Sequence, residues 1–349
     1  MHRFRIPDAI FASLLLVVAP MALQAQAPRP EAVGLRPDAP TYAKHGPYWV
    51  GAREFVIKTS VEGRSLPATL WYPALNPKGS QEANTFSFDD AAFSGKVLTI
   101  SGHALVDAPP DSSGGPYPLV VFSHGDDNSR LLSTYFMEHL ASHGFMALGI
   151  DHLKPNTERP NDIKSAIDFA EKISTAAPAF TGLVDTAHVA AAGHSSGGLT
   201  ALQVGGARYI GGLTDFLDSR VKALIPMASF GKAEGLDLAA VKVPTLLLLG
   251  ASDRWIKLSA IKGIYEALPA AQKLLVILSG GGHAMFLNPN VPVPEDGYGA
   301  LDLNRAHDLI NHFTTAFLLD VLKGDKEAHK ALLPEAVKCE EVQYTTTWK

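Results

Sequence analysis

The fold of this chain is decided by the stretch His188-Val-Ala-Ala-Ala-Gly193-His194-Ser195-Ser196-Gly197-Gly198. The small apolar residues up to Ala192 are typical of a central parallel strand that is covered on both faces, and the residues from Gly198 onwards favour a helix. A strand that breaks so sharply into a helix leaves no room for side chains beside the break, so glycines must flank it. We therefore predict a turn that holds Ser195 in a strained backbone and exposes its hydroxyl as a nucleophile. A glycine-rich turn without chemistry is the alternative.

Strands and helices alternate on both sides of this turn, which is typical of βαβ units and a parallel sheet. Near the N-terminus, Glu54–Ser60 and Leu66–Tyr72 predict an antiparallel hairpin at a sheet edge. The link between the strands that end at Met227 and begin at Pro244 is only about 16 residues long, too short for a separate lid domain. The predicted fold class is α/β: a mostly parallel, doubly wound sheet with an N-terminal antiparallel hairpin and no large lid domain. The other expected elements are strands over 119–122, 145–150, 221–227, 244–249 and 273–278, and helices over 131–143, 162–175 and 304–322.

The N-terminus has the three-part layout of a secretory signal peptide. Arg3 and Arg5 precede an apolar run from Ala9 to Leu23, and Ala25-Gln-Ala27 offers small residues for cleavage after Ala25 or after Ala27. The apolar run is too short for a comfortable membrane span, and a retained membrane anchor is the alternative. We expect residues 1–27 to be a signal peptide and the mature chain to be periplasmic or secreted, without a stable membrane span.

Length and composition fit one domain behind this segment. The chain has 349 residues, of which 46% are hydrophobic and 19% charged, so it can bury a large core. A formal net charge of −5 gives no electrostatic footprint for nucleic acid. The single cysteine, Cys339, leaves an exported protein without an internal disulfide. We expect an extended lead-in over 28–53 and a single domain over 54–349, in which residues 77–118 form a surface excursion.

Two later loops supply the residue types that a serine nucleophile needs. A serine hydroxyl is a poor nucleophile near neutral pH and requires a base, which is itself oriented by an acid. Asp253 follows the strand over 244–249, and His283 follows three glycines after the strand over 273–278, the expected last strand. We predict Ser195, Asp253 and His283 as the catalytic residues. A turn-forming Asp253 and an ordinary loop His283 are the alternatives. The rival acids are Asp215, Asp218 and Asp237.

Backbone N–H groups must also stabilise the negative oxygen of the tetrahedral intermediate. One donor is expected at Ser196, directly after the nucleophile and at a helix N-terminus. The second is expected at Asp126, in the turn after the strand over 119–122, where Gly125 lets the backbone approach closely. The Asp126 carboxylate has no part in this role and is expected to face solvent or to cap the following helix.

Further side chains are candidates for the pocket or for other sites. His139 and His143 lie one helical turn apart and could bind zinc, but a role as partners of the helix dipole is favoured, and no metal site is predicted. Arg130 could meet an anionic substrate group, but a solvated position at a helix start is favoured. The candidate pocket residues near strand ends, with core packing as the alternative, are Met227, Trp255 and Phe286.

Four stretches resemble the α/β-hydrolases related to platelet-activating factor acetylhydrolase and the predicted dienelactone hydrolases. The resemblance covers roughly residues 54–323 in pattern, and it implies an α/β-hydrolase fold. It also implies a serine esterase that acts on short-acyl or otherwise accessible esters with neither a metal nor an organic cofactor. The stretches are Tyr117-Pro-Leu-Val-Val-Phe-Ser-His-Gly125, His139-Leu-Ala-Ser-His-Gly-Phe145, Gly193-His-Ser-Ser-Gly-Gly198 and His283-x-x-Phe286.

Three differences from related groups refine this expectation. True dienelactone hydrolases use a cysteine nucleophile, whereas this chain has Ser195. Animal plasma acetylhydrolases carry the acid just after the strand that follows the nucleophile, where this chain has Ile225-Pro226, so the role returns to Asp253. Secreted polyester hydrolases have a similar arrangement, but they usually carry an aromatic residue at the oxyanion turn and disulfides. Asp126 and the lone Cys339 therefore indicate a more distant relation to that group.

The sequence as a whole predicts a serine carboxylic-ester hydrolase that works through a Ser-His-Asp triad and an acyl-enzyme intermediate. Its expected partners are small-molecule or lipid-like esters, with short-acyl, phospholipid-acetyl and polyester-type esters as candidate classes. Two alternatives remain open: an acyltransferase or peptidase of the same fold, and a non-catalytic binding module that keeps this fold. Rates on an ester and an amide with matched acyl groups separate the first from an esterase, and labelling by a fluorophosphonate separates the second.

Overall fold

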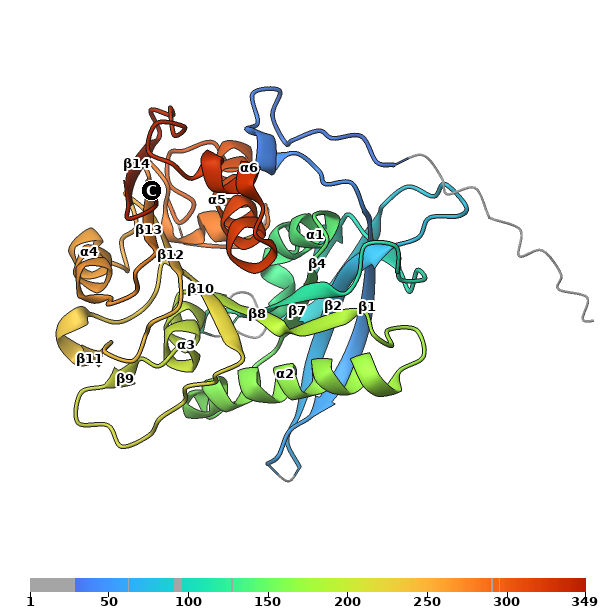
Figure 1. Cartoon of the computed structure of the whole chain (residues 1–349), viewed down its shortest axis with the longest axis horizontal. Helices are drawn as coiled ribbons and strands as arrows, with labels where there is room; N and C mark the ends of the chain where they lie inside the picture. The colour runs from blue at the N-terminus through green and yellow to red at the C-terminus, as the bar shows by residue number, and fades with distance from the viewer. Residues whose placement is uncertain (1–28, 62, 91–95, 127, 290, 295) are drawn as a thin grey trace, which may run out of the picture.

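The computed structural model describes residues 29–349 apart from residues 62, 91–95, 127, 290 and 295 (Figure 1). The expected signal peptide, residues 1–27, lies outside the described residues. Among those described, no helix combines the length and the apolar character that crossing a bilayer requires.

A sheet of ten strands runs through the described part of the chain in the order β14-β13-β12-β10-β8-β6-β7-β2-β1-β5. The strands from β13 to β7 in this order are parallel. Helices α1 and α5 lie on one face of the sheet, and α2 and α3 lie on the other (Figure 1). The chain therefore has the predicted α/β-hydrolase fold. The strands are β1 Trp49–Lys58, β2 Ser65–Ala74, β5 Leu105–Val106, β6 Tyr117–Ser123, β7 Met146–Ile150, β8 Val184–His194, β10 Val221–Met227, β12 Thr245–Gly250, β13 Lys273–Leu278 and β14 Val342–Thr346. The helices are α1 Thr134–Ser142, α2 Arg159–Ala176, α3 Ser196–Val204, α4 Leu258–Ala267, α5 Leu303–Lys323 and α6 Lys326–Ala331.

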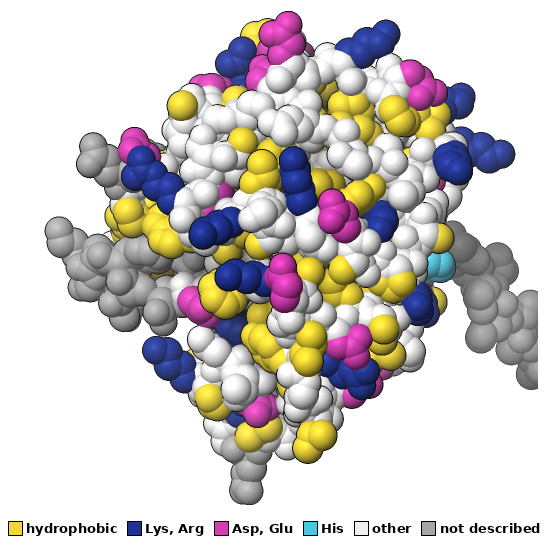
Figure 2. All heavy atoms as spheres, turned by 90° about the vertical axis from the view of Figure 1, so that its left-hand side faces the viewer, with side chains coloured by type: hydrophobic (Ala, Val, Ile, Leu, Met, Phe, Trp, Pro, Cys, Tyr) yellow, Lys and Arg dark blue, Asp and Glu magenta, His cyan; other side chains and the backbone are white. Residues whose placement is uncertain are grey.

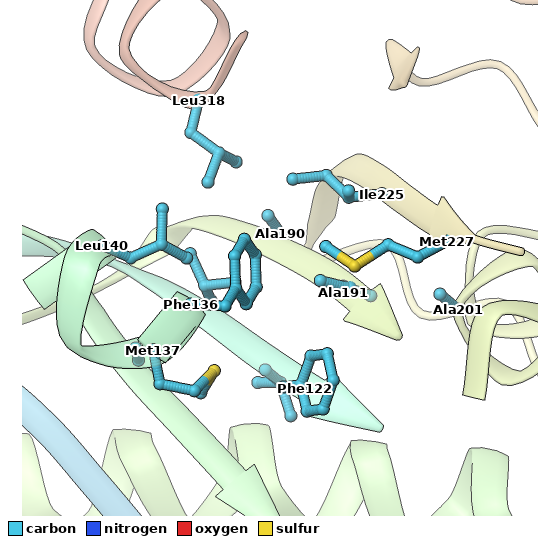
Figure 3. Close-up of a cluster of buried hydrophobic side chains, with 14 of the residues drawn as sticks. Phe122, Phe136, Met137, Leu140, Ala190, Ala191, Ala201, Ile225, Met227 and Leu318 are labelled. Atoms are coloured by element: carbon cyan, nitrogen blue, oxygen red, sulfur yellow. The ribbon is translucent and has the colours of Figure 1, made fainter. Parts of the chain in front are cut away.

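The central strands are buried on both faces because each carries an unbroken apolar run. Residues 246–249 of β12 and 274–278 of β13 are all at most 2% exposed. Figure 3 shows part of this core, in which Phe122 of β6 and Phe136 of α1 lie near the small Ala190 and Ala191 of β8. Burying a large apolar side chain contributes about 1.5–3 kcal/mol. Since Cys339 is free, this core is the main source of stability.

The predicted N-terminal hairpin is confirmed, with longer strands than expected. β1 and β2 pair antiparallel from Trp49–Ala74 to Lys58–Ser65, so β1 begins at Trp49 and not at Glu54. β2 does not form the sheet edge, because it also pairs with β7. Beyond β1, the described part of the sheet ends with the two residues of β5.

The connection between β10 and β12 contains no domain-sized insertion, as predicted. It holds the single-turn 3-10 helix η4 (Ala233–Gly235) and the short strand β11 (Leu236–Asp237). β11 pairs antiparallel with β9 (Arg208–Tyr209), which follows α3.

Residues 77–118 contain more regular structure than the expected surface excursion. β3 (Asn84–Asp90) and β4 (Lys96–Gly102) pair antiparallel in a sheet of their own. Phe86 packs edge-on against Trp71 of β2 with ring centroids 5.9 Å apart, and the His103 N–H donates to Glu138 Oε1 at 2.9 Å. The excursion is thus docked on β2 and α1.

β13 is not the last strand, contrary to the prediction. After α5 the chain forms α6 and then β14, which pairs antiparallel with β13 and covers its edge. Trp348 anchors this end: its side chain is 3% exposed, and its Nε1 donates to Asp320 Oδ2 at 2.7 Å. β14 therefore removes a parallel edge that would otherwise be open to pairing with another chain.

The lead-in is held against α1 and α5, where two histidines bind it. His139 Nε2 donates to the Tyr42 carbonyl at 2.8 Å, and His143 Nε2 donates to the Lys44 carbonyl at 2.9 Å. Burial lowers the pKa of His139 well below its usual value and that of His143 to about 4, so both rings are neutral. Lys323 instead caps the end of α1, with Nζ 2.7 Å from the Gly144 carbonyl. The favoured dipole role of the two histidines is therefore wrong. Within the described ranges no three metal-ligating side chains are clustered.

Candidate active site

Ser195 occupies the break between β8 and α3 with φ 57° and ψ −119°. A non-glycine residue rarely adopts a positive φ, and such strain persists only where the surroundings fix it. The Ser195 N–H donates to the Met227 carbonyl at 2.9 Å, and the Ser195 carbonyl accepts from Gly198 N at 2.9 Å and from Phe230 N at 3.0 Å. These backbone contacts hold the serine in its turn.

The glycines on either side of Ser195 are required by close backbone contacts. A Cβ atom on Gly193 would lie 2.3 Å from the Gly197 carbonyl oxygen, and a Cβ atom on Gly197 would lie 1.9 Å from the Ser123 carbonyl oxygen. No side chain fits at either position. Glycine at both Gly193 and Gly197 therefore has the steric cause that the sequence predicts.

Asp253 and His283 are in direct contact, although 30 residues separate them. His283 Nδ1 lies 2.7 Å from Asp253 Oδ2, and the aspartate side chain is fully buried. The other oxygen, Oδ1, accepts from Trp255 N at 2.9 Å and from Ile256 N at 2.8 Å. The carboxylate is therefore fixed by the backbone of its own turn and presents one oxygen to the imidazole.

The three rival carboxylates bind elsewhere. Asp237 pairs with Arg208 at 2.8 Å, and Asp218 pairs with Arg220 at 2.6 Å. Asp215 Oδ1 accepts from Leu217 N at 2.9 Å within its own loop. The structure brings none of them to His283.

The loop that carries His283 is held in place by backbone hydrogen bonds on both sides of the histidine. Gly282 N donates to the Tyr298 carbonyl at 2.8 Å, and Ala284 N donates to the Gly297 carbonyl at 2.8 Å. The His283 carbonyl accepts from His194 Nε2 at 2.9 Å. Because burial lowers the pKa of His194 well below its usual value, that ring is neutral. The imidazole of His283 is thereby positioned by its backbone as well as by Asp253.

Ser195 and His283 line one pocket of about 280 Å³. Trp255 belongs to its wall and meets the His283 ring edge-on, with centroids 5.1 Å apart. Phe230 forms another part of the wall. Phe230 is 57% exposed and Trp255 is 54% exposed. The remaining lining residues are Gly125, Asp126, Asn128, His194, Ser196, Ile256, Ala284, Leu287, Val293 and Pro294. A mostly apolar wall thus surrounds the reactive groups.

Met227 and Phe286 do not line this pocket, so the expectation for these two side chains is wrong. Met227 is 2% exposed and Phe286 is 1% exposed. Figure 3 shows Met227 in the buried cluster near Ala191. Both side chains point into the core, which was the alternative interpretation. Met227 contributes to the turn only through its carbonyl, which accepts from Ser195 N.

A larger hollow of about 790 Å³ beside β9 and β11 includes neither Ser195 nor His283 in its wall. Figure 2 views the molecule from this side, where hydrophobic side chains are interspersed with charges of both signs. Tyr209, Ile210 and Leu213 are exposed here.

Asp126 and Ser196, the two expected oxyanion donors, are joined through their side chains. Ser196 Oγ donates to Asp126 Oδ2 at 2.6 Å, and Asn156 Nδ2 donates to Asp126 Oδ1 at 3.0 Å. The Asp126 side chain is 55% exposed, in agreement with the expectation that it faces solvent. It does not cap the following helix, which was the other expectation, but bridges the turn after β6 to the start of α3. This bridge fixes the two residues relative to each other.

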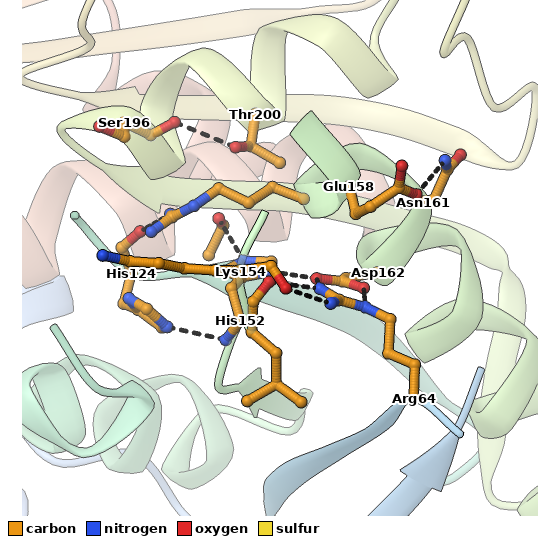
Figure 4. A network of polar contacts seen from close by, with 12 residues as sticks. Arg64, His124, His152, Lys154, Glu158, Asn161, Asp162, Ser196 and Thr200 are labelled. Carbon is orange, nitrogen blue, oxygen red and sulfur yellow. Dashed lines mark hydrogen bonds and ion pairs between the residues drawn. The ribbon is translucent and has the colours of Figure 1, made fainter. Parts of the chain in front are cut away.

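A buried polar network behind this turn was missed in the sequence (Figure 4). Arg159 and Asp126 form an ion pair at 3.3 Å, and Arg159 also contacts backbone carbonyls of the turn. His152 lies 2.9 Å from Asp162 through Nδ1 and 2.8 Å from Ser123 Oγ through Nε2. Burial lowers the pKa of His152, against the opposing effect of Asp162. Polar residues at a predicted helix start gave no signal that they face inward.

Arg130 is neither solvated nor available to a substrate. Its side chain pairs with Asp151 and, at 2.9 Å, with Glu54, and the residue is only 7% exposed. The guanidinium also donates to Thr69 Oγ1 at 2.8 Å. Arg130 therefore ties the start of the helical segment to β1 and β2.

Comparisons with known proteins give a consistent family. The family model described as PET hydrolase-like matches residues 79–299. Cutinase 2 of Thermobifida cellulosilytica is 27% identical over 228 residues, which cover 62% of this chain and 80% of the cutinase. Chlorophyllase-1 of Citrus unshiu is 24% identical over 329 residues, 82% of this chain and 92% of the chlorophyllase. Platelet-activating factor acetylhydrolase of Cavia porcellus is 23% identical over 353 residues, 81% of this chain and 78% of that enzyme.

These matches confirm the expected likeness to platelet-activating factor acetylhydrolase. They also show that the relation to polyester hydrolases is closer than the sequence suggested. Asp126 and Cys339 suggested a more distant relation to the latter group, yet its family model covers the site from the oxyanion turn to His283. The low identities agree with divergence within the family. This chain belongs to the PET hydrolase-like family and is a carboxylic-ester hydrolase of the α/β-hydrolase fold.

Proposed function

We propose that this protein hydrolyses carboxylic esters through Ser195, His283 and Asp253. Ser195 Oγ attacks the ester carbonyl carbon while His283 takes the hydroxyl proton and then donates it to the leaving alkoxide. Asp253 holds the imidazole in the required tautomer and stabilises its protonated form. The N–H groups of Asp126 and Ser196 bind the oxyanion. Water, deprotonated by His283, then cleaves the acyl-enzyme.

The contact between His283 Nδ1 and Asp253 Oδ2 at 2.7 Å supports this proposal most directly. It leaves Nε2 as the ring nitrogen available to the nucleophile. Ser195, which adopts a positive φ, lines the same pocket as His283. A strained serine and an oriented imidazole that line one pocket support acyl transfer through these two residues.

The substrates are accessible esters with an apolar group beside the scissile bond. A pocket of about 280 Å³ with Trp255, Ile256 and Leu287 in its wall favours short acyl or aromatic groups. Among the described residues, no lid domain separates this pocket from solvent. The names of the relatives add cutin, poly(ethylene terephthalate) and platelet-activating factor as sources of such esters.

A rate profile over p-nitrophenyl esters from acetate to long-chain acyl groups, with a polyester film and an oxidised phospholipid, tests this function. Ser195→Ala is expected to abolish hydrolysis while the protein stays folded. Ser101→Ala, an exposed serine on β4, is the matched control and should keep wild-type rates. Near-normal turnover by Ser195→Ala would rule the mechanism out.

Export belongs to the same proposal, because residues 1–27 have the layout of a signal peptide. N-terminal sequencing of protein recovered from outside the cytoplasm should begin at Gln26 or Pro28. Recovery of the chain only with Met1 in place, from the membrane fraction, would instead identify an anchor.

A further inference from the structure

The peptide unit between Gly125 and Asp126 is held from behind by two donors. The Gly125 carbonyl accepts from Arg159 Nη2 at 3.0 Å and from His124 Nδ1 at 2.6 Å. Arg159 Nη1 donates to the preceding carbonyl, that of His124, at 2.6 Å. The forked guanidinium therefore grips two successive carbonyls of the turn.

These contacts also set the direction of the Asp126 N–H. In a trans peptide unit the carbonyl and the N–H point in opposite directions, so a Gly125 carbonyl fixed towards Arg159 turns the Asp126 N–H away from Arg159. Gly125 and Asp126 line the pocket that contains Ser195, whereas Arg159 is absent from the described wall of that pocket. A Cβ atom on Gly125 would lie 3.5 Å from Ser195 Cβ. The side away from Arg159 is thus the side of the nucleophile.

Arg159 is itself rigidly placed. It is the first residue of α2 and is 3% exposed. His124, which shares the Gly125 carbonyl, accepts from His152 N through Nε2 at 3.0 Å. Since Nε2 accepts, Nδ1 carries the proton and donates, in agreement with burial lowering the pKa of His124 well below its usual value. Figure 4 shows His124 and His152 within this network.

The array Ser123, His152 and Asp162 has the connectivity of a catalytic triad but cannot meet a substrate. Ser123 is fully buried, and its carbonyl lies against Gly197. His152 bonds Ser123 Oγ and Asp162 at 2.8 Å and 2.9 Å. The array immobilises the start of the turn. Arg64, in the connection between β1 and β2, donates to Asp162 Oδ2 at 2.7 Å and adds a further contact to it.

Arg159 also offsets the charge that Asp126 brings to the oxyanion hole. A carboxylate beside a developing negative oxygen raises the energy of the transition state. The Asp126 carboxylate pairs with Arg159 at 3.3 Å and accepts from Ser196 Oγ at 2.6 Å. One guanidinium thus orients the first donor, pairs with its half-exposed carboxylate and, through the Asp126–Ser196 bridge, is linked to the second donor.

We propose that Arg159 is a positioning residue of this enzyme: by holding the Gly125 carbonyl, it aims the Asp126 N–H at the oxyanion. The inference rests on the proposed function, since it assigns a role within the Ser195 reaction. Arg159 is not among the residues that line the pocket of Ser195, so its loss is expected to act on the transition state and to leave substrate binding nearly unchanged.

Kinetics of Arg159→Met, Arg159→Lys and Arg130→Met test this role. Arg159→Met is expected to lower kcat by about 10- to 100-fold, less than the loss of a whole oxyanion donor, with KM changed by less than about twofold. Arg159→Lys keeps the charge and one donor and should recover part of the rate. Arg130→Met removes another buried guanidinium, which pairs with Asp151 and Glu54 and donates to Thr69, so its kcat should stay at the wild-type value.

A trifluoromethyl ketone separates positioning from a general structural role. Ser195 Oγ adds to the ketone carbon and leaves an oxyanion in the hole, whereas the matching secondary alcohol binds without forming one. Arg159→Met should weaken binding of the ketone by the same factor by which it lowers kcat/KM. It should leave the affinity for the alcohol unchanged. If Arg159→Met does not fold, as judged by circular dichroism, Arg159→Lys undergoes the same comparison.

The outcomes distinguish the two proposals. If the folded Arg159 variants keep wild-type kinetics and wild-type affinity for the ketone, the role of Arg159 is overturned. If Ser195→Ala is inactive in the same assays, the proposed function still holds. Equal weakening of the ketone and the alcohol also overturns the role of Arg159, because a distorted pocket would explain that result. Hydrolysis that does not depend on Ser195 overturns both.

Discussion

Ser195 sits in a backbone conformation that costs about 1–3 kcal/mol, and the contacts around it leave no alternative. At Gly193 and Gly197 the backbones of β8, α3 and the end of β6 lie so close together that there is no room for a Cβ atom. The same closeness lets Ser195 N bond the Met227 carbonyl at 2.9 Å. The strain is thus a consequence of packing, and the packing depends on two missing side chains.

Gly197→Ala tests this dependence. The new Cβ would lie 1.9 Å from the Ser123 carbonyl oxygen, so the backbone must move and the free energy of unfolding should fall by more than about 3 kcal/mol. Gly235→Ala is the matched control, since a Cβ there meets nothing within 4 Å, and it should change stability by less than about 0.5 kcal/mol. Urea denaturation measures both. Equal stability of the two variants would show that the turn tolerates a side chain.

Asp253→Asn tests the orientation of His283. An amide in place of the carboxylate cannot stabilise the protonated imidazole, so kcat should fall roughly 10³- to 10⁴-fold while KM changes little. Asp237→Asn removes a surface carboxylate paired with Arg208 and should keep the wild-type kcat. A loss of less than about tenfold in Asp253→Asn would argue that another group orients His283.

At this scale the sequence was informative where the signal is local. Ser195 between two glycines, Asp253 on a turn after a strand, and His283 after three glycines could each be read from their neighbours. Arg159 could not, because its partners are carbonyls of residues 34 and 35 positions away. For the same reason Asp126 gave no sign that its carboxylate would bond Ser196, a contact made only when two strand ends meet.

Single elements show which patterns were too weak to interpret. In β3, Thr85-Phe86-Ser87-Phe88 alternates with period two, and β14 does so in Val342-Gln-Tyr344, but each run is short and bordered by polar residues. The parallel strands carry four or more consecutive apolar residues, so their positions could be predicted to within a few residues. Edge and accessory strands depend on partners that no local pattern specifies.

Glu138 of α1 makes the docking of the β3–β4 excursion sensitive to pH. Burial raises the pKa of Glu138 from 4.5 to about 8, so the folded protein keeps a proton that the unfolded chain releases above pH 4.5. Stability from this group is fully present below pH 4.5 and is lost as pH rises to about 8. Glu138→Gln should therefore match the wild type near pH 5 and become the more stable protein by pH 8, by up to about 1.4 kcal/mol per pH unit.

Urea denaturation of both proteins at pH 5, 6.5 and 8 measures this difference. The comparison cancels other titrating groups, because they are common to the two proteins. A constant difference over this range would show that Glu138 is ionised in the folded state.

Trp348 tests how much the C-terminal strand contributes. Its indole is buried against Phe317, with ring centroids 5.8 Å apart, and donates to Asp320. Trp348→Ala should lower the free energy of unfolding by about 3–5 kcal/mol and leave kcat unchanged, because β14 lies at the sheet edge beyond β13. Gln343→Ala, an exposed position on β14, is the control. Unchanged thermal stability of Trp348→Ala would mean that β14 is not part of the cooperative fold.

The whole molecule explains why residues far apart in sequence can form one site. Parallel strands β6, β8, β12 and β13 all end at the same edge of the sheet, and the oxyanion turn, the nucleophile, Asp253 and His283 each follow one of these ends. The order of the strands in the sheet is therefore enough to bring these residues to one place. Fold class and chain order were therefore predictable, whereas the walls of the pocket, built from loops, were only partly so.

The most direct test of the account is peptide mass spectrometry of the protein after reaction with a fluorophosphonate. Oxygen of the activated serine displaces fluoride from phosphorus, so the adduct marks the nucleophile. We expect one adduct, on the peptide that contains Ser195, and no adduct in Ser195→Ala. An adduct on another serine, or an unlabelled protein that still hydrolyses esters, would contradict it.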